Sequence, residues 1–179
     1  NPGVIRFPGG CFASFYDWKD GVGPYSERAP QPSYFWGGFN YNDVGTAEFA
    51  NFCKELGCEM MFCVNVYHPL KRSYQHYINH EFQGKHDEDF KEFQDVQKGA
   101  LDTAGWVAYC NLAKRAHPMA DLRVEHGYKE PFGVKYWELD NEVFRWFQPQ
   151  EYAMAAVTYS KAMKGIDPDI KIGLVTYAS

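Results

Sequence analysis

Hydrophobic and polar positions alternate along this chain in blocks that predict strands and helices in regular succession. The predicted strands are 3–7, 59–66, 133–139 and 170–176, and the predicted helices are 46–56, 103–116 and 149–165. In the first helix Phe49, Phe52, Cys53 and Leu56 recur at the i, i+3, i+4 and i+7 spacing of one helix face. Strands that alternate with helices favour an α/β fold with a parallel sheet and right-handed crossovers.

Two connections are longer than usual for such a fold. Residues 9–44 are rich in glycine, proline and aromatic residues, and residues 67–100 are polar with clustered charges. Connections of this length without secondary structure are uncommon, so we expect short helices within 67–100. Trp18 and Trp36 in the first connection can provide stacking faces for a ligand or pack into the core beneath the loop.

Polar signatures follow three of the predicted strands directly: PGGCF, VNVYH and LDNE. The carboxyl ends of parallel strands meet at one edge of a sheet, and sites in parallel α/β proteins form there. The sequence therefore predicts a functional site at this edge. No glycine-rich phosphate fingerprint opens a helix after any of these strands, which weighs against a nucleotide site.

Composition narrows the class of protein. The 179 residues suit one domain, and 45% hydrophobic with 23% charged residues is ordinary for a folded protein. The aromatic content of 18% suits a carbohydrate ligand or a large core equally well. A net charge of −5 without a basic block argues against nucleic-acid binding. The sequence contains no run of about 20 apolar residues, so no membrane span is predicted. Both ends of the sequence fall in strand-like segments, which predicts part of a larger fold of undetermined compartment.

Asn141 and Glu142 are the main candidates for chemistry. Trp137, Phe144 and Trp146 lie close in sequence, and desolvation by these rings would raise the pKa of a carboxyl group toward the range of a general acid. Asn141 could then donate its amide to a substrate hydroxyl while Glu142 protonates a leaving oxygen. The alternative is that these two residues only begin a surface loop.

Other polar residues have structural explanations that compete with functional ones. Arg6 in a short buried strand needs a partner, so we expect an ion pair with site carboxylates in preference to a ligand clamp. His76 and His80 are four residues apart, but no third ligand follows at a clear spacing, so we expect no metal site. The five cysteines are odd in number and contain no C-x-x-C, which favours free thiols.

Several long motifs in one order resemble glycoside hydrolase family 51. They are GVIRFPGGCFASFYDWKDGVGP, the arginine of SERAP, FW at 35–36, VGTAEF, FCVN, WVAYCN, LRVEHGYKEP and VKYWELDNE. The resemblance runs from about residue 3 to 176, apart from 66–100. The family consists mainly of α-L-arabinofuranosidases with a (β/α)8-barrel, so the resemblance implies that 1–179 is an incomplete catalytic barrel domain, roughly strands 2 to 5, with an extended loop insertion at about 66–100.

The resemblance also implies a role for individual residues. Glu142 matches the general acid/base of a retaining mechanism, and Asn141 matches the residue that bonds the furanose 2-hydroxyl. Arg6 matches the arginine before PGG, and Cys11 follows PGG where many members have asparagine. The remaining matches are Trp36, which closes the sugar pocket, and the strand 3 residue Asn65. No metal or organic cofactor is needed for this chemistry.

The resemblance further implies that the nucleophile, a glutamate after strand 7, lies outside this chain. We therefore expect the 179 residues alone to be inactive and not independently stable. The expected function is removal of terminal α-L-arabinofuranosyl residues from plant-type polysaccharides or oligosaccharides. A β-xylosidase or endoglucanase of the same clan, or a non-catalytic carbohydrate-binding or structural relative, are the alternatives. The expected partner is the carbohydrate, with a homo-oligomer left open.

Two features depart from the family pattern. Asp140 stands where the family usually has glycine, so a second carboxylate lies two residues from Glu142. Asp140 could raise the pKa of Glu142 further or bond to the part of the barrel outside this chain. The segment 66–100 is longer than the usual loop after strand 3, which predicts a reshaped substrate cleft.

Overall fold

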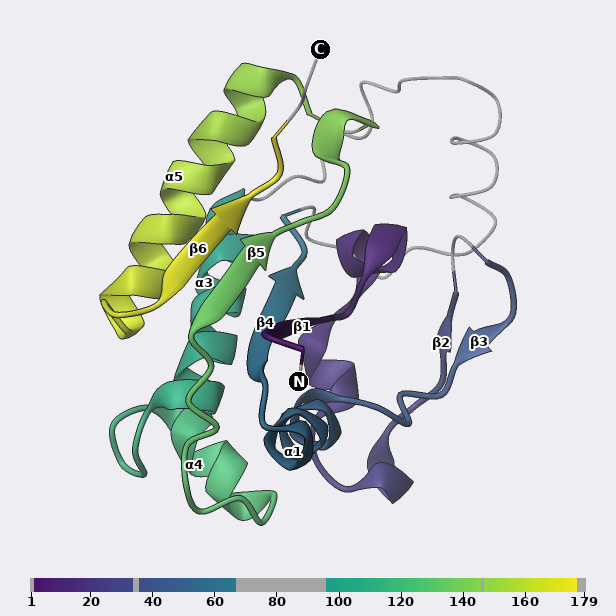
Figure 1. Ribbon diagram of the computed structural model, residues 1–179, viewed down its shortest axis with the longest axis vertical. Coiled ribbons are helices and arrows are strands. Elements are labelled where there is room, and N and C mark those ends of the chain that lie inside the picture. Colours follow the sequence, from purple (N-terminus) through teal and green to yellow (C-terminus); the bar gives the residue numbers. More distant parts are fainter. Residues whose placement is uncertain (1, 34–35, 67–95, 146, 177–179) are drawn as a thin grey trace.

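The computed structural model describes residues 2–33, 36–66, 96–145 and 147–176. Within these residues the main sheet has four strands in the order β1 (Val4–Phe7), β4 (Glu59–Val64), β5 (Tyr136–Leu139) and β6 (Lys171–Leu174). Each neighbouring pair is parallel. Figure 1 shows β4, β5 and β6 side by side, with their carboxyl ends directed toward the same end of the molecule. The predicted α/β fold with a parallel sheet is therefore confirmed.

In the part of the chain that the structure describes, four α-helices accompany the sheet: α1 (Thr46–Leu56), α3 (Val96–Asn111), α4 (Pro118–Glu125) and α5 (Pro149–Ile166). The bounds of α1 agree with the prediction and those of α5 differ by one residue. The helix predicted at 103–116 was placed wrongly, because α3 begins seven residues earlier and ends at Asn111. The Asn111 side chain bonds both the backbone N and O of Val134, and so ties the end of α3 to the segment before β5.

The helix α4 was not predicted. It begins at Pro118, and the His117 side chain accepts a hydrogen bond from the backbone N of Met119, as an N-cap does. Its apolar spacing is weak, so the local cap and proline were the only sequence signals. Residues 67–95, which include His76 and His80, lie outside the described residues. The short helices expected within 67–100 therefore stay a prediction for this part of the segment.

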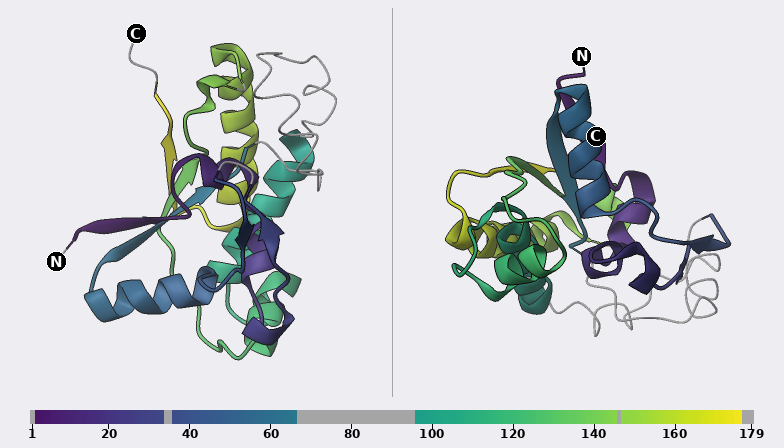
Figure 2. Two further views of the ribbon diagram at one scale, coloured as in Figure 1. Left: turned by 90° about the vertical axis from the view of Figure 1, so that its right-hand side faces the viewer. Right: turned by 90° about the horizontal axis from the view of Figure 1, so that it is seen from below.

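The core lies between one face of the sheet and the helices (Figure 2). Alternation along the strands directs Phe62 and Trp137 to this face, and both side chains are fully buried. Trp106 of α3 lies at its centre, with ring centroids 4.6 Å from Phe62, 5.5 Å from Trp137 and 5.8 Å from Trp18. Trp18 is thus a core residue beneath the long connection, which is one of its two expected roles.

The described residues of the connection 9–44, which exclude 34–35, form three 3₁₀ helices and a small hairpin. They are η1 (Gly10–Phe15), η2 (Trp18–Gly21), η3 (Tyr25–Glu27) and the strands β2 (Gln31–Pro32) and β3 (Phe39–Asn40). Arg28 fastens this connection to α1, because its guanidinium bonds the Gly23 and Asn42 carbonyls and both carboxylate oxygens of Glu48. The hydrogen bonds and charge of Glu48 outweigh burial and raise the pKa of Arg28.

The strand β1 is less buried than the sequence indicated. Its residues alternate between exposed and half-buried, and the Arg6 side chain is 34% exposed. The expectation of a buried strand was wrong because β1 is an edge strand of the described sheet, with β4 on one side only. Val4 on β1 and Leu174 on the opposite edge strand β6 are exposed as well.

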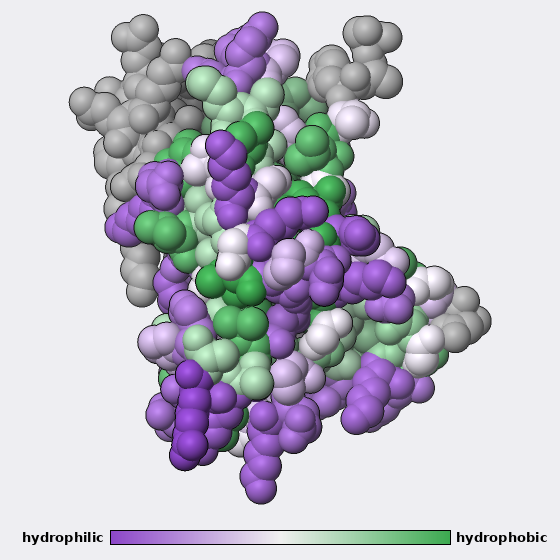
Figure 3. Space-filling model, turned by 90° about the vertical axis from the view of Figure 1, so that its left-hand side faces the viewer, coloured by the Kyte–Doolittle hydropathy of each residue, from purple (hydrophilic) through white to green (hydrophobic). Residues whose placement is uncertain are grey.

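The face of the molecule in Figure 3 carries an interrupted band of apolar surface between hydrophilic residues. Exposed apolar residues of the chain include Met154 and Val157 on α5.

Within the described residues, no helix combines the length and hydrophobicity needed to cross a membrane. All five cysteines are free thiols, as predicted, with Cys53, Cys63 and Cys110 buried.

Arg123 of α4 is a fully buried cation that bonds backbone carbonyl groups. Its Nη1 donates to the carbonyl oxygens of Tyr109 at 2.6 Å and Leu112 at 2.8 Å, near the end of α3, and its Nε donates to Tyr128 O at 3.1 Å. These contacts satisfy carbonyl groups that a helix end leaves without partners. Burial lowers the pKa of Arg123.

Replacing Arg123 with leucine should lower the free energy of unfolding by about 3 kcal/mol or more. Hydrogen bonds to charged groups contribute about 1.5–3 kcal/mol each, and their loss would leave buried carbonyls unpaired. Chemical denaturation measures the change, with the exposed Arg115→Leu as the matched control. Equal stability of the two variants would contradict a structural role for the buried guanidinium.

Candidate active site

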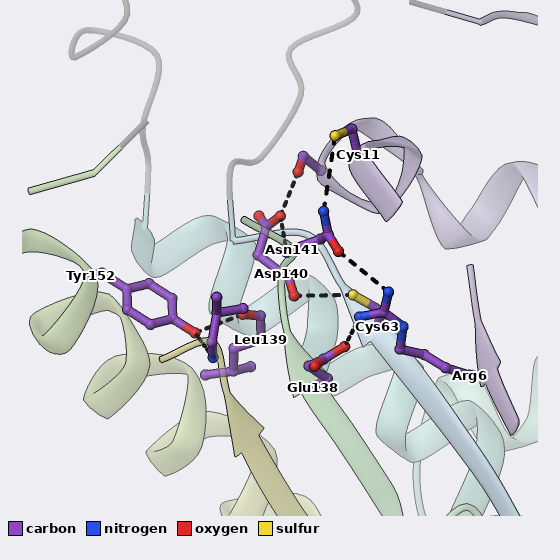
Figure 4. Close-up of polar contacts among 10 residues, drawn as sticks. Arg6, Cys11, Cys63, Glu138, Leu139, Asp140, Asn141 and Tyr152 are labelled. Carbon is purple, nitrogen blue, oxygen red and sulfur yellow. Dashed lines mark hydrogen bonds and ion pairs between the residues drawn. The ribbon is translucent and has the colours of Figure 1, made fainter. Parts of the chain in front are cut away.

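The candidate site lies at the carboxyl ends of β1, β4 and β5. The chain passes from β1 into η1, which carries Cys11, while Asn65 follows β4 and the turn 140–142 follows β5. Hydrogen bonds join these segments directly, since Asn141 bonds Arg6 and Asp140 bonds both η1 and the end of β4 (Figure 4). Residues more than 70 positions apart in the sequence are therefore in contact at one edge of the sheet.

The turn after β5 has an unusual backbone. Asp140 has φ 64° and Glu142 has φ 48°, so two non-glycine residues adopt the left-handed conformation. This conformation costs roughly 1–2 kcal/mol per residue and persists where the surrounding contacts demand it. Strain of this kind is concentrated at functional sites, which supports a specialised role for the turn.

Glu142 lies at the surface beside Cys11. The Cys11 thiol donates to Glu142 Oε2 at 3.7 Å, and Asn141 Nδ2 lies 4.0 Å from the same sulfur. The enclosure of Glu142 by aromatic rings, expected from the sequence, is wrong within the described chain. Glu142 is exposed, Phe144 is 48% exposed, and Trp137 is buried in the core on the other face of the sheet. Trp146, the third ring, is outside the described residues.

Arg6 pairs with Glu138 on β5 and also reaches Asn141. Its Nη1 contacts Glu138 Oε2, and its Nη2 donates to Asn141 Oδ1 at 3.3 Å. Burial opposes the charged form of Arg6, but the hydrogen bond and charge of Glu138 outweigh it and raise the Arg6 pKa. The expected ion pair of Arg6 thus involves Glu138 in place of Glu142. Sequence reasoning missed Glu138, although alternation along YWEL places it on the face opposite Trp137.

The two remaining candidates are Asn65, which bonds the backbone, and Trp36, which lies at the surface. Asn65 Nδ2 donates to the carbonyl oxygen of Tyr16, so this side chain ties the end of β4 to the segment after η1. Trp36 lies between β2 and β3 with 73% of its surface exposed. This exposure is typical of a surface ring and not of a pocket wall, so the closure of a sugar pocket by Trp36 stays a prediction.

The carboxylate of Asp140 points into the protein, where it bonds Ser14 of η1 and the backbone N of Val66. Sequence reasoning singled out Asp140 but missed Ser14, which is 1% exposed.

Among the residues that the structure describes, no group of His, Cys, Asp or Glu is arranged to hold a metal ion.

The family of the chain follows from comparison with known proteins. The model of the alpha-L-arabinofuranosidase 1 domain matches residues 1–179. The chain belongs to this α-L-arabinofuranosidase family. It is 37% identical over 175 residues to the probable alpha-L-arabinofuranosidase C of Aspergillus fumigatus, and 32% identical over 174 residues to the intracellular exo-alpha-(1->5)-L-arabinofuranosidase of Halalkalibacterium halodurans. Each alignment covers 94% of this chain, which spans 28% and 29% of those relatives.

Solved structures of α-L-arabinofuranosidases share the fold of this chain. The Thermotoga maritima enzyme, in complex with arabinose, is 30% identical with a TM-score of 0.77, and the match covers 97% of this chain and 31% of that one. The GH51 enzyme of Thermotoga petrophila gives 30% identity and a TM-score of 0.76, with 97% and 31% covered. The resemblance to glycoside hydrolase family 51 is thereby confirmed.

Proposed function

We propose that this chain is part of the catalytic domain of a retaining α-L-arabinofuranosidase. Its substrates would be terminal α-L-arabinofuranosyl residues of plant-type polysaccharides or oligosaccharides. The observation that carries the proposal is the exposed Glu142 at the carboxyl end of β5, beside Cys11 and Asn141, in a chain that matches the α-L-arabinofuranosidase family over its whole length. The two relatives described above are named as α-L-arabinofuranosidases, which supports an arabinofuranosyl residue as the sugar that is removed.

In this proposal Glu142 is the general acid/base. It protonates the glycosidic oxygen as the sugar is transferred to a nucleophile, and then removes a proton from the water that releases the sugar. Its exposure leaves room for the leaving group and later for that water. The nucleophile would be a second glutamate from a part of the protein outside 1–179.

Asn141 is suited to donate a hydrogen bond to a furanose hydroxyl. Its Oδ1 accepts from Arg6, which fixes the orientation of the amide and leaves the Nδ2 hydrogens on the side of Cys11. We propose that Arg6 and Asn65 support this arrangement, that Cys11 lines the subsite next to Glu142, and that Trp36 closes the pocket once the sugar is bound.

We further propose that the four parallel strands are strands 2 to 5 of a (β/α)8-barrel. Helices cover one face of the sheet, while the other carries Arg6, Cys63 and Glu138, as the interior of a barrel would. Exposed Val4 and Leu174 on the two edge strands suit further strands on either side. Residues 1–179 would then form an incomplete catalytic domain, whose extended loop at about 66–100 lies mostly outside the described residues.

The complete protein that carries this chain should hydrolyse 4-nitrophenyl α-L-arabinofuranoside about 10²-fold or more faster than the β-D-xyloside, because a site that bonds specific hydroxyls rejects sugars that misplace them. The 179-residue polypeptide alone should be inactive. A preference for the xyloside would favour a related glycosidase, and inactivity of the complete protein would favour a non-catalytic relative. Activity of the 179 residues alone would contradict a nucleophile outside the chain.

A further inference from the structure

The buried carboxylate of Asp140 joins three segments of the candidate site. Asp140 is fully buried, and its Oδ1 accepts hydrogen bonds from Ser14 Oγ at 2.5 Å and from the backbone N of Asn141 at 2.7 Å. Its Oδ2 accepts from the backbone N of Val66 at 2.8 Å. One side chain thus links η1, the end of β4 and the turn after β5.

The backbone N and O of Asp140 are also hydrogen-bonded. Its N donates to Val64 O at 2.8 Å, which extends the pairing of β4 and β5 by one residue, and its carbonyl accepts from the Cys63 thiol at 3.2 Å (Figure 4). Aspartate tolerates the left-handed conformation because its short side chain can bond the backbone locally. The bond from Asn141 N to Asp140 Oδ1 is such a local contact.

Glu142, two residues further on, is also left-handed and has its side chain at the surface. Its direction therefore depends on how firmly the preceding residues of the turn are held. Cys11, which contacts both Glu142 and Asn141, lies in η1, and Ser14 of the same helix bonds Asp140. The Asp140 carboxylate thus links η1, which carries Cys11, to the turn that carries Glu142.

We propose that Asp140 is a positioning residue for Glu142. Its carboxylate fixes the turn 140–142 against η1 and the end of β4, and so sets the direction from which Glu142 delivers its proton. The proposal rests on the function proposed above for Glu142. Asp140 itself would contact neither substrate nor the reacting atoms, because its side chain is fully buried against Ser14 and the backbone N of Val66.

The test is a set of variants of the complete protein assayed on aryl α-L-arabinofuranosides with a range of leaving groups. Asp140→Gly accepts the left-handed backbone but lacks the carboxylate, and Asp140→Asn keeps the size and one acceptor oxygen. Asp167→Gly is the matched control, because the Asp167 carboxylate accepts from Asn111 Nδ2 and Asp169 N in the segment before β6, at the other end of the sheet. Thermal unfolding is measured for every variant.

A misdirected general acid harms poor leaving groups most, because these need the proton. We expect Asp140→Gly to lower kcat/KM about 10²-fold for a poor leaving group, the typical cost of a misplacement of about 1 Å, and much less for dinitrophenol. Asp140→Asn should recover part of the loss. Asp167→Gly should keep the wild-type dependence on the leaving group even where its stability falls.

The outcomes separate this proposal from the proposed function. In a Glu142→Gln background, Asp140→Gly should cause no further loss on poor leaving groups. An equal loss for all leaving groups, or no loss, would overturn the positioning role of Asp140. If Asp140→Gly fails to fold, Asp140→Asn and Ser14→Ala provide the same comparison with smaller losses. Failure of the proposed function would instead appear as unchanged activity of Glu142→Gln alone.

Discussion

Glu142→Gln is expected to lower kcat/KM of the complete protein on a natural arabinofuranoside by about 10²–10⁴-fold, the usual contribution of a positioned general acid/base. Glutamine keeps the size of the side chain and its contact with the Cys11 thiol, but it cannot deliver or accept the proton. The loss should therefore be chemical, with folding unchanged. Steady-state kinetics on an arabino-oligosaccharide measure it.

The same variant should behave differently on an activated substrate. A dinitrophenyl leaving group departs without protonation, so formation of the sugar–enzyme intermediate should remain fast and its hydrolysis should become limiting. Azide needs no general base, and it should restore turnover and give an arabinofuranosyl azide with the anomeric configuration of the substrate. Glu59→Gln, an exposed carboxylate at the opposite end of β4, is the control. Unchanged turnover of both substrates by Glu142→Gln would rule out the acid/base role.

Arg6→Met is expected to lower kcat/KM by about 10²-fold, as a small misplacement of a site residue does. The substitution removes the bond to Asn141 Oδ1 and frees the amide that the proposal assigns to the sugar. It also leaves Glu138, 22% exposed, without its cation. Arg6→Lys should restore only part of the activity, because one ammonium does not reproduce the planar fork that reaches both partners. Kinetics with thermal unfolding measure both effects.

A double-mutant cycle divides the effect of Arg6 between its two partners. Glu138→Gln removes the charge that Arg6→Met leaves unpaired, so the double variant should regain stability relative to Arg6→Met. Its activity should stay low, because Asn141 still lacks its arginine. Lys171→Met, at the opposite end of β6, is the control for loss of a cation. Full activity of Arg6→Met would contradict the role of Arg6 in orienting Asn141.

Much of the fold could be predicted because its signals are local. Strand–helix alternation indicated the parallel sheet, and the periodicity of α1 and the proline at the start of α5 located these helices almost to the residue. The end of α3 could not be predicted, since it depends on bonds between Asn111 and Val134, 23 residues away. The short helix α4 was missed because its apolar pattern is weak and its cap is a histidine.

The candidate site was only partly predictable for the same reason. The end of β5 could be predicted from the polar run that follows YWEL. The partners of Arg6 and Asp140 could not, because Glu138 and Ser14 lie 132 and 126 residues from them in sequence. Proximity in sequence was also misleading, since it suggested that Trp137 encloses Glu142. The alternation of the strand directs Trp137 into the core instead.

A crystal structure of the complete protein with bound arabinose would test the central claim most directly. The account predicts a second glutamate, from outside residues 1–179, whose carboxyl group lies about 5–5.5 Å from that of Glu142, the spacing of a retaining glycosidase. The sugar should lie between them, with Asn141 bonded to one of its hydroxyl groups. A separation of about 6.5–9.5 Å, as in inverting enzymes, or a sugar bound away from Glu142, would contradict the account.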